Sequence, residues 1–213
     1  MTSTEATAPH RGTRRSGRRK VEVLEAACRV IAERGAEATR FTDVAAASAV
    51  PVSTLQYYFG SREDLLVAAF RHASDAELAE LEADVAQLGD PWEQLTCIAT
   101  RALAGYRPPA ADTARSGKLW IESWHFALRD AEMRADTLRD YTAWRRLIAG
   151  AVRAGMDSGR FTARLAPDRA AILINALLDG IGIPLALYDP DITLDGAIAE
   201  CTSVLADLLG LAH

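Results

Sequence analysis

Residues 42–66, TDVAAASAVPVSTLQYYFGSREDLL, decide the fold of this chain. They predict a helix over Asp43–Ser48, a short turn, and a second helix over Val52–Phe59, in which Leu55 and Phe59 share one face. Two short helices joined by a turn of this kind are typical of a helix-turn-helix. In that motif the second helix lies in the major groove of DNA and the first crosses the backbone.

The side chains that point away from the Leu55–Phe59 face suit contact with DNA. Hydroxyl, amide and phenol groups bind phosphates and base edges without bringing a carboxylate near the duplex. The predicted DNA-binding residues are Thr42, Val52, Ser53, Thr54, Gln56, Tyr57, Tyr58 and Arg62. We expect base contacts from the polar members among residues 53–57, and phosphate contacts from Thr42, Tyr58 and Arg62.

The residues after the second helix predict where it stops and where the next one starts. Gly60 suits a helix end because glycine accepts a left-handed backbone. Ser61–Asp64 then has the pattern of a capping box, whose free amides can hold a phosphate beside Arg62. An ordinary helix pair in an all-α core is the alternative interpretation, because apolar pairs at helical spacing are common in cores.

A wider set of residues resembles the DNA-binding domain of the TetR/AcrR family of regulators, over Arg18–Phe70. The matching residues are Ala26-Ala27, Glu33-Arg34-Gly35, Thr42, Val44-Ala45, Val50, Leu55, Tyr57-Tyr58-Phe59, Ser61-Arg62-Glu63 and Leu65. No member of this set is specific alone, but the combination is. The resemblance implies a three-helix DNA-binding domain followed by a helical domain that dimerises and binds an effector.

Three residues depart from the family pattern. Gln56 stands where tyrosine is most common, Ala49 replaces the usual glycine of the turn, and Pro51 replaces the usual serine cap. Proline is compatible with a helix start, because the amide it lacks has no partner there. Glutamine bonds adenine in two places where tyrosine does not, so Gln56 changes the expected base preference.

Charge is distributed unevenly along the 213 residues. The net charge is −5, yet residues 1–73 contain 11 Lys and Arg against 8 Asp and Glu, while the remainder has a net charge of −8. We therefore expect only the first part to meet DNA.

The sequence indicates a cytoplasmic protein. It has three scattered cysteines, no secretory signal and no apolar run near the ~20 residues of a membrane span.

The order of helix signals predicts an all-α chain of about nine helices in two domains. Residues 1–17 form a flexible basic arm, 18–73 the helix-turn-helix domain, and 74–213 the effector-binding and dimerisation domain. The basic residues of the arm are expected to contact DNA phosphates. The alternative interpretation is a solvated tail that makes no contact. The expected helices span 18–34, 43–48, 52–59, 62–88, 91–106, 113–129, 132–158, 167–186 and 194–209. No glycine or proline interrupts 62–88, which predicts a stiff connection between the domains.

The last two expected helices are apolar on more than one face, which predicts burial by a partner chain. The residues concerned are Ile172, Leu173, Ala176, Leu177, Gly180, Ile181, Ile198, Val204, Leu205, Leu208 and Leu209. Two helices from each chain would make a four-helix interface with two-fold symmetry, and the TetR resemblance implies the same homodimer. Such a dimer reads a palindromic operator with half-sites ~34 Å, or a multiple, apart. Residues 177–191, with 120–128 upstream, also loosely resemble the C-terminal domain of BetI-like members.

The sequence contains no spacing typical of a catalytic site, a metal site or a cofactor site, so no enzyme, metal or cofactor is predicted. A ligand pocket remains, with aromatic residues and a few polar groups in an apolar setting. Its candidate residues are Trp120, Trp124, His125, Trp144, Asn175 and Asp179. Alternatively, the tryptophans are core, and Asn175 and Asp179 face solvent or a partner helix. Aromatic rings near Glu122 or Asp179 favour a cationic or aromatic ligand.

These patterns together predict a DNA-binding transcriptional regulator, a homodimeric repressor that a small-molecule effector releases from its operator. A ligand that prefers one conformation shifts the population by its difference in affinity. An activator or an effector-independent DNA-binding protein is the first alternative. A helical enzyme on the same fold is the second, and the sequence lacks the residues that it would need.

Overall fold

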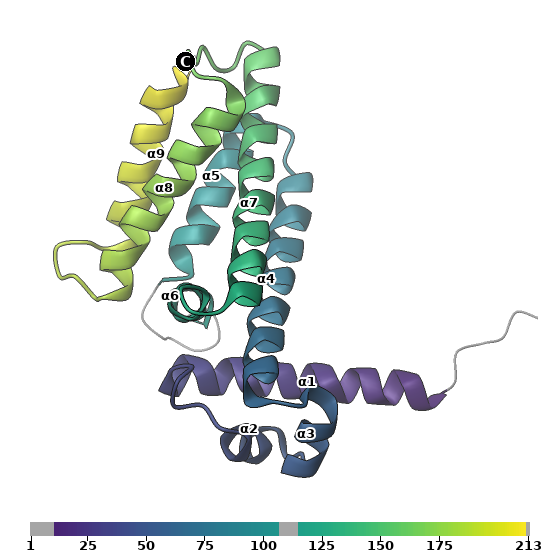
Figure 1. The fold of residues 1–213 in the computed structure, drawn as a ribbon. Coiled ribbons are helices and arrows are strands. Elements are labelled where there is room, and N and C mark those ends of the chain that lie inside the picture. Colours follow the sequence, from purple (N-terminus) through teal and green to yellow (C-terminus); the bar gives the residue numbers. More distant parts are fainter. Residues whose placement is uncertain (1–10, 107–114, 212–213) are drawn as a thin grey trace, which may run out of the picture. The chain divides into compact units, whose positions relative to one another are not determined.

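The structure is a computed structural model that describes residues 11–106 and 115–211. Within these residues the chain forms α-helices arranged in two compact units, which divide between His72 and Ala73 (Figure 1). The helices are α1 (Arg11–Arg34), α2 (Phe41–Ser48), α3 (Val52–Phe59), α4 (Arg62–Ala86), α5 (Pro91–Ala104), α6 (Arg115–Ala127), α7 (Ala131–Asp157), α8 (Pro167–Ala186) and α9 (Leu194–Leu209). The predicted all-α class of about nine helices is confirmed over the described residues.

The core of the first unit lies under the two short helices. Val44 of α2 and Leu55 of α3 are fully buried, and Phe59 is 8% exposed. Beneath them α1 presents a stripe of fully buried residues at helical spacing, Val23, Ala27 and Ile31. This arrangement confirms that α2 and α3 are held by one apolar face each, which leaves their other faces to solvent.

The turn between α2 and α3 has a left-handed residue at its centre. Ala49 has φ 54°, and the Val50 amide donates to the Ala45 carbonyl at 3.2 Å. A residue with a Cβ pays roughly 1 kcal/mol or more in this conformation, which is why glycine is common there. Val50, only 4% exposed, anchors the turn in the core despite that cost. Pro51 then occupies the N-cap position of α3 with φ −58° and makes no side-chain cap hydrogen bond, which agrees with the expectation that proline is compatible with this helix start.

Helix α2 begins two residues before the predicted start at Asp43. The Asp43 carboxylate accepts from the backbone amide of Arg40 at 3.0 Å and from the Arg34 guanidinium at 2.7 Å. A carboxylate at the third helical position that reaches back to the cap amide stabilises the helix start. Asp43 therefore caps α2 from inside the first turn.

Helix α1 begins earlier than the composition predicts. Residues 11–17, which we expect to belong to the flexible arm, are helical. Arginine is a good helix former, and each residue added to an existing helix gains one hydrogen bond, so the stable segment extends backwards. Residues 1–10 of the predicted arm lie outside the described residues.

Helix α4 is a single helix whose residues up to His72 belong to the first unit and whose later residues belong to the second. It ends at Ala86, two residues before the predicted end. The amides of Gln87 and Leu88 donate to Asp84 and Val85, each at 3.1 Å. These bonds span three residues, so the helix tightens into a 3₁₀-like turn before it stops.

The second unit is a bundle in which α5, α7, α8 and α9 run side by side, and α6 packs against α7 and α8 (Figure 1). Its centre consists of fully buried apolar side chains on four helices, including Leu103 of α5, Ile148 of α7, Ile174 of α8 and Leu205 of α9. Helices α5, α6 and α7 differ by one or two residues from the predicted ends. The predicted loop at 107–112 and the predicted helix start at Thr113 lie outside the described residues.

Among the described helices, α8 alone is long and apolar enough to cross a membrane. Its mean hydropathy over a window of 18 residues is 1.5. A helix in the middle of a bundle meets the same criterion. Because α8 packs against α5, α7 and α9, and carries Asn175 and Asp179, the criterion is weak support for a span.

Candidate functional sites

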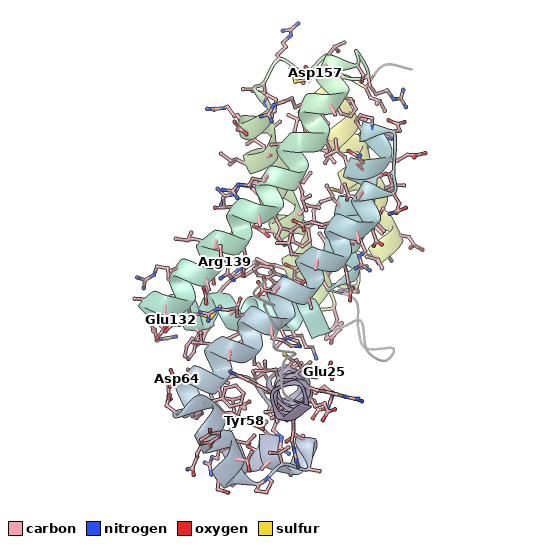
Figure 2. The ribbon with its side chains drawn as sticks, turned by 90° about the vertical axis from the view of Figure 1, so that its right-hand side faces the viewer. Glu25, Tyr58, Asp64, Glu132, Arg139 and Asp157 are labelled. Carbon is pink, nitrogen blue, oxygen red and sulfur yellow. The ribbon has the colours of Figure 1, made fainter. Side chains whose placement is uncertain are left out.

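The outer face of α3 is polar and accessible. Ser53, Gln56 and Tyr57 are exposed, and Tyr57, at 86%, is the most exposed large hydrophobic side chain among the described residues. Val52, Thr54 and Tyr58 are half-buried, and the Tyr58 ring meets Phe59 edge-on. Figure 2 labels Tyr58 among the side chains of the first unit. The helix therefore presents hydroxyl, amide and phenol groups on a surface that its buried underside holds in place. Thr42, in the first turn of α2, is exposed as well.

Arg62 makes hydrogen bonds that its sequence position does not suggest. Its Nε donates to the Thr39 carbonyl at 2.6 Å, and Nη2 donates to the carbonyls of Ala36 and, at 2.8 Å, Glu37. Its Nη1 donates to the Glu63 carboxylate at 3.1 Å. Four donors of the guanidinium are thus engaged inside the first unit. Arg62 holds the α1–α2 loop against the start of α4, and its phosphate contact stays a prediction.

The start of α4 is capped as the sequence predicts. Ser61 Oγ donates to Asp64 Oδ2 at 2.6 Å and accepts from the Asp64 amide at 3.0 Å. The Ser61 amide donates to the same carboxylate at 3.2 Å. The Asp64 carboxylate therefore already interacts with part of the helix end where a phosphate is expected.

A pocket lies inside the second unit, with an empty volume of about 480 Å³ that includes part of its open mouth. Five helices contribute to its lining, and five of the eleven lining residues are aromatic, with three polar or charged residues among the others. The lining residues are Glu77, Ala102, Tyr106, Gly117, Trp120, Trp124, Tyr141, Trp144, Asn175, Leu178 and Asp179. This composition is typical of a site for a small organic molecule.

Three rings of the pocket form a cluster with nearly equal separations. The centroids of Trp120 and Trp124 are 6.2 Å apart, and the Tyr141 centroid lies 6.3 Å and 6.4 Å from them. On Tyr141 the Arg145 guanidinium lies 5.3 Å from the ring centroid. Aromatic faces carry partial negative charge, so such a cluster attracts cations.

Two carboxylates line the same pocket. Asp179 accepts from the Tyr141 hydroxyl at 2.8 Å and from Asn175 Nδ2 at 3.1 Å. Burial raises the pKa of Asp179, against the opposing effect of these two hydrogen bonds and of Arg145. Glu77 of α4 accepts from Trp120 Nε1 at 3.1 Å. The described lining includes these two carboxylates and no lysine or arginine, and the Arg145 guanidinium lies against the ring of the lining residue Tyr141.

Two glycines make room for the ring of Tyr106, which is 9% exposed. A Cβ at Gly182 would lie 2.4 Å from that ring, and one at Gly117 would lie 2.7 Å from it. Any larger residue would displace the ring, so the tight approach of α6 and α8 to Tyr106 shapes one wall of the pocket.

Five of the six candidate ligand residues line this pocket: Trp120, Trp124, Trp144, Asn175 and Asp179. His125 does not; it is exposed, and its Nε2 lies 2.8 Å from Arg129 Nη1. A helical residue next to a lining residue points about 100° away from it, which explains the miss. Asn175 and Asp179 therefore face the pocket, not solvent or a partner helix.

The sequence did not single out Glu77, Tyr106 and Tyr141, which also line the pocket. Tyr141 is three residues before Trp144, so it lies on the same face of α7, and this spacing was an available signal. Glu77 had no such signal, because it comes from another helix far away in the chain.

Comparison with known proteins identifies both parts of the chain. Residues 23–69 match the model of the bacterial regulatory proteins of the tetR family. Residues 99–210, more than half of the chain, match the model of the BetI-type transcriptional repressor C-terminal domain. No curated protein sequence matches the chain.

Solved structures share the fold at low sequence identity. A protein from Saccharomonospora viridis, described as a transcriptional regulator and solved in complex with choline, is 24% identical and has TM-score 0.81, over 89% of this chain and 96% of that one. A TetR-family regulator from Rhodococcus sp. is 24% identical with TM-score 0.74, over 91% and 99%. The regulator FadR of Bacillus subtilis, solved with stearoyl-CoA, is 22% identical with TM-score 0.69, over 90% and 98%.

The helix-turn-helix with its exposed α3, the helical bundle with its internal pocket, and the two family matches agree with one another. The chain belongs to the TetR family, with a C-terminal domain of the BetI type, and is a DNA-binding transcriptional regulator.

Proposed function

We propose that this regulator is a homodimeric repressor, located in the cytoplasm, which a small organic cation releases from a palindromic operator. The observation that carries the proposal is the pair of carboxylates, Glu77 and Asp179, in a pocket otherwise lined largely by aromatic rings. Quaternary ammonium groups bind in such aromatic surroundings through cation–π attraction and the nearby negative charge.

Operator binding uses the exposed face of α3. Ser53, Thr54, Gln56 and Tyr57 contact base edges, because they are the polar side chains on the face of α3 that solvent reaches. Thr42, Tyr58 and the basic N-terminal arm contact phosphates, with Val52 packed beside them. The continuity of α4 supports a mechanical route from the pocket to this surface, since Glu77 and Asp64 belong to the same helix.

The dimer forms through α8 and α9. Four apolar side chains are at least 44% exposed on these helices: Ile172, Leu173 and Ile183 of α8, and Val204 of α9. On α8, Ile172, Leu173 and Ile183 follow helical spacing together with Ala176 and Gly180, so they form one stripe, and Val204 adds an exposed apolar side chain on α9. A second copy of the chain that pairs stripe to stripe buries this apolar surface under two-fold symmetry.

Calorimetry with choline tests the effector class, because choline is the ligand of the structural relative from Saccharomonospora viridis. The control ligand is the uncharged isostere of choline, in which a tert-butyl group replaces trimethylammonium. We expect choline to bind at least about tenfold more tightly than the isostere, and Asp179→Asn to reduce this preference. Choline should also release the protein from operator DNA. Equal binding of both ligands, or binding of neither, would contradict the cationic effector.

A further inference from the structure

Helix α7 buries two aspartates that do not line the pocket. Asp136 is 8% exposed and Asp140, one turn later, is 4% exposed. Arg139, labelled in Figure 2, lies between them in the sequence and bonds both. Its Nη1 donates to Asp136 Oδ1 at 3.0 Å, and its Nη2 donates to Asp140 Oδ1 at 3.1 Å. Aspartate is almost never fully buried unless it is paired, so this group needs a physical explanation.

The same group of side chains joins α7 to α4. The Ser74 hydroxyl donates to the Asp140 carboxylate, and Arg139 Nη2 lies 3.5 Å from Asp75 Oδ1. Ser74 and Asp75 are the second and third residues of the second unit. The contact therefore attaches α4 to α7 at the point where α4 enters this unit.

The adjoining residues of α4 are held in the second unit by polar groups. None of residues 73–77 is buried, and Leu81 is the first residue of α4 after them that is fully buried. Glu77 accepts a hydrogen bond from Trp120. Water can replace a polar contact of this kind, whereas separating Leu81 from the core exposes apolar surface. Residues 73–77 are thus the part of α4 that can leave the bundle at low cost.

The charges around Asp140 do not balance. Three carboxylates, those of Asp75, Asp136 and Asp140, contact one guanidinium, so the four ionised side chains carry a net charge of −2. Burial raises the pKa of Asp140 by more than the hydrogen bonds from Ser74 and Arg139 lower it. The surroundings of this carboxyl group therefore disfavour its ionised form.

A hydroxyl on the same helix is also buried at a cost. Thr137 lies three residues before Asp140 and is 6% exposed, and its Oγ1 has no hydrogen-bond partner. Most buried polar groups of native proteins are paired, so an exception calls for a reason. Hydration would give Thr137 a partner and would stabilise ionised Asp140. Both observations favour a second, hydrated arrangement of this part of α7.

We propose that Asp140 is the release element of a latch between α4 and α7. When it is protonated, the closed arrangement of this structure is favoured, and when it is ionised, an open arrangement in which water replaces Ser74 is favoured. Helix α4 contains both Glu77 of the pocket and residues up to His72 of the DNA-binding unit, so the latch biases operator binding. This regulatory role rests on the proposed effector-released repressor, whereas the latch itself does not.

The sign of the pH dependence follows from the groups around Asp140. The charged groups that act on it are Arg139 of α7 and Asp75 of α4, and none comes from the described parts of α5, α6 and α8, which also pack on α7. Since the pKa of Asp140 is raised in the closed latch, that state binds the proton more tightly than the open state does. Its advantage is complete below the ordinary pKa of a carboxyl group and is lost as the pH rises through the raised pKa. One proton changes the ratio of the two states by at most about tenfold per pH unit.

The distance between α4 and α7 tests the latch without DNA or effector. Spin labels on the exposed positions Ala76 and Thr142, in a chain with Cys97→Ser, report this distance when labelled subunits are diluted with unlabelled ones. We expect the short-distance population to grow as the pH falls through the raised pKa of Asp140. Asp140→Asn should show the short distance at every pH. The matched control, Asp75→Asn, removes an exposed carboxylate that contacts the same guanidinium and should keep the pH dependence.

Chemical denaturation separates the latch from an ordinary stabilising ion pair. Because the surroundings of Asp140 disfavour its charge, Asp140→Asn should be at least as stable as the intact protein at neutral pH. A clear loss of stability would mean that the carboxylate stabilises the closed state, which contradicts the proposal. The measurement on the intact protein also stands alone, since distances that do not change with pH overturn the latch.

Operator binding then tests the regulatory role. At neutral pH we expect the operator affinity of Asp140→Asn to differ from that of the intact protein by at least about fivefold, and its choline affinity to change in the opposite direction. A pH dependence of the distance that survives in Asp140→Asn overturns the role of this residue. An open and a closed latch with equal operator affinity overturn the regulatory role. If choline does not bind the intact protein, the proposed effector is wrong, and the distances still decide the latch.

Discussion

Arg62 ties the start of α4 to the loop that follows α1, through three backbone carbonyls at 36, 37 and 39. Hydrogen bonds from a charged donor are stronger than neutral ones, and these carbonyls lose that donor if the guanidinium is removed. Arg62, which follows the expected DNA-binding helix in the sequence, thus also positions the α1–α2 loop. This role depends on the direction in which its N–H groups point.

We expect Arg62→Ala to lower the unfolding free energy by about 1–3 kcal/mol, because the loop loses the hydrogen bonds that a charged donor makes to its carbonyls. Operator affinity should fall alike for all sequences, and the slope of log affinity against log salt should stay unchanged if the loop carbonyls, and not a phosphate, hold the guanidinium in the complex. Thermal unfolding and a salt titration of binding measure the two effects. Glu63→Ala, which removes only the exposed ion pair with Arg62, is the control. If the variant keeps its stability and the salt slope falls by the amount expected for one lost phosphate contact, Arg62 contacts a phosphate, as predicted from the sequence.

The carboxyl group of Asp179 is the reason to expect that effector binding depends on pH. Burial is the largest cause that raises the pKa of its carboxyl group, and Arg145 lowers it. The other groups facing it are the Tyr141 and Tyr106 phenols, whose own pKa values are raised by burial, and Glu77. The proton therefore stays on both phenols at neutral pH.

We expect the affinity for choline to fall as the pH drops through the raised pKa of Asp179, because the protonated carboxyl no longer attracts the cation. The charge of choline does not titrate, so the dependence belongs to the protein. Calorimetry in buffers of different ionisation enthalpy should show proton release on binding. In Asp179→Asn the binding should be weaker and lose this dependence. An unchanged profile in the variant would assign the titration to another group.

At the scale of the element, the close packing of α6 and α8 on Tyr106 shapes the pocket. Gly117 and Gly182 lie where a Cβ would collide with the Tyr106 ring. A helix loses stability by carrying glycine, so glycine at these positions is explained by the contact and not by helix propensity. The wall of the pocket thus depends on two residues that contribute no side chain to it.

Replacing Gly182 by alanine should displace the Tyr106 ring. We expect a loss of about 1–3 kcal/mol in unfolding free energy from overpacking, together with weaker choline binding. Gly150→Ala is the matched control, because a Cβ there meets nothing within 4 Å and should raise stability by up to about 1 kcal/mol. Chemical denaturation and calorimetry measure both. Choline affinity that survives Gly182→Ala would show that Tyr106 does not shape the site.

At the scale of the whole molecule, α8 and α9 present apolar side chains that the bundle leaves uncovered, among them Ile172 and Val204. Leu205 and Leu209, which the sequence places in the dimer interface, are fully buried in the chain's own core. That part of the prediction is wrong, because each helix has one face for its own bundle and another for solvent, and periodicity marks both as apolar. The exposed residues Ile172 and Val204 are better probes of the interface.

We expect Ile172→Glu combined with Val204→Glu to convert the dimer into monomers, since each chain would bring two carboxylates into an apolar contact. Operator affinity should fall sharply, because the α3 helices of the two subunits are no longer linked in one molecule. Leu138→Glu, on the exposed side of α7 at 57% exposure, is the control and should leave the dimer intact. Sedimentation at micromolar concentration measures the state. A dimer that persists in the double variant would place the interface elsewhere.

Much of this protein follows from local sequence. Leu55 and Phe59 at helical spacing, followed by Gly60 and the Ser61–Asp64 cap, determine α3 and the start of α4, because the forces concerned act within one or two turns. The same local signals determine the all-α class and most helix ends.

The sequence predicts five residues of the pocket, but only the tertiary structure shows how separate helices assemble them around one cavity. The same holds for the role of Arg62. Glu77 meets Trp120 across 43 positions, and Tyr141 meets Asp179 across 38. Periodicity tells which face of a helix is apolar but not which helix it meets, nor whether the contact closes into core or leaves a cavity. That choice depends on how side chains from several helices fill the same space, and no single segment contains this information.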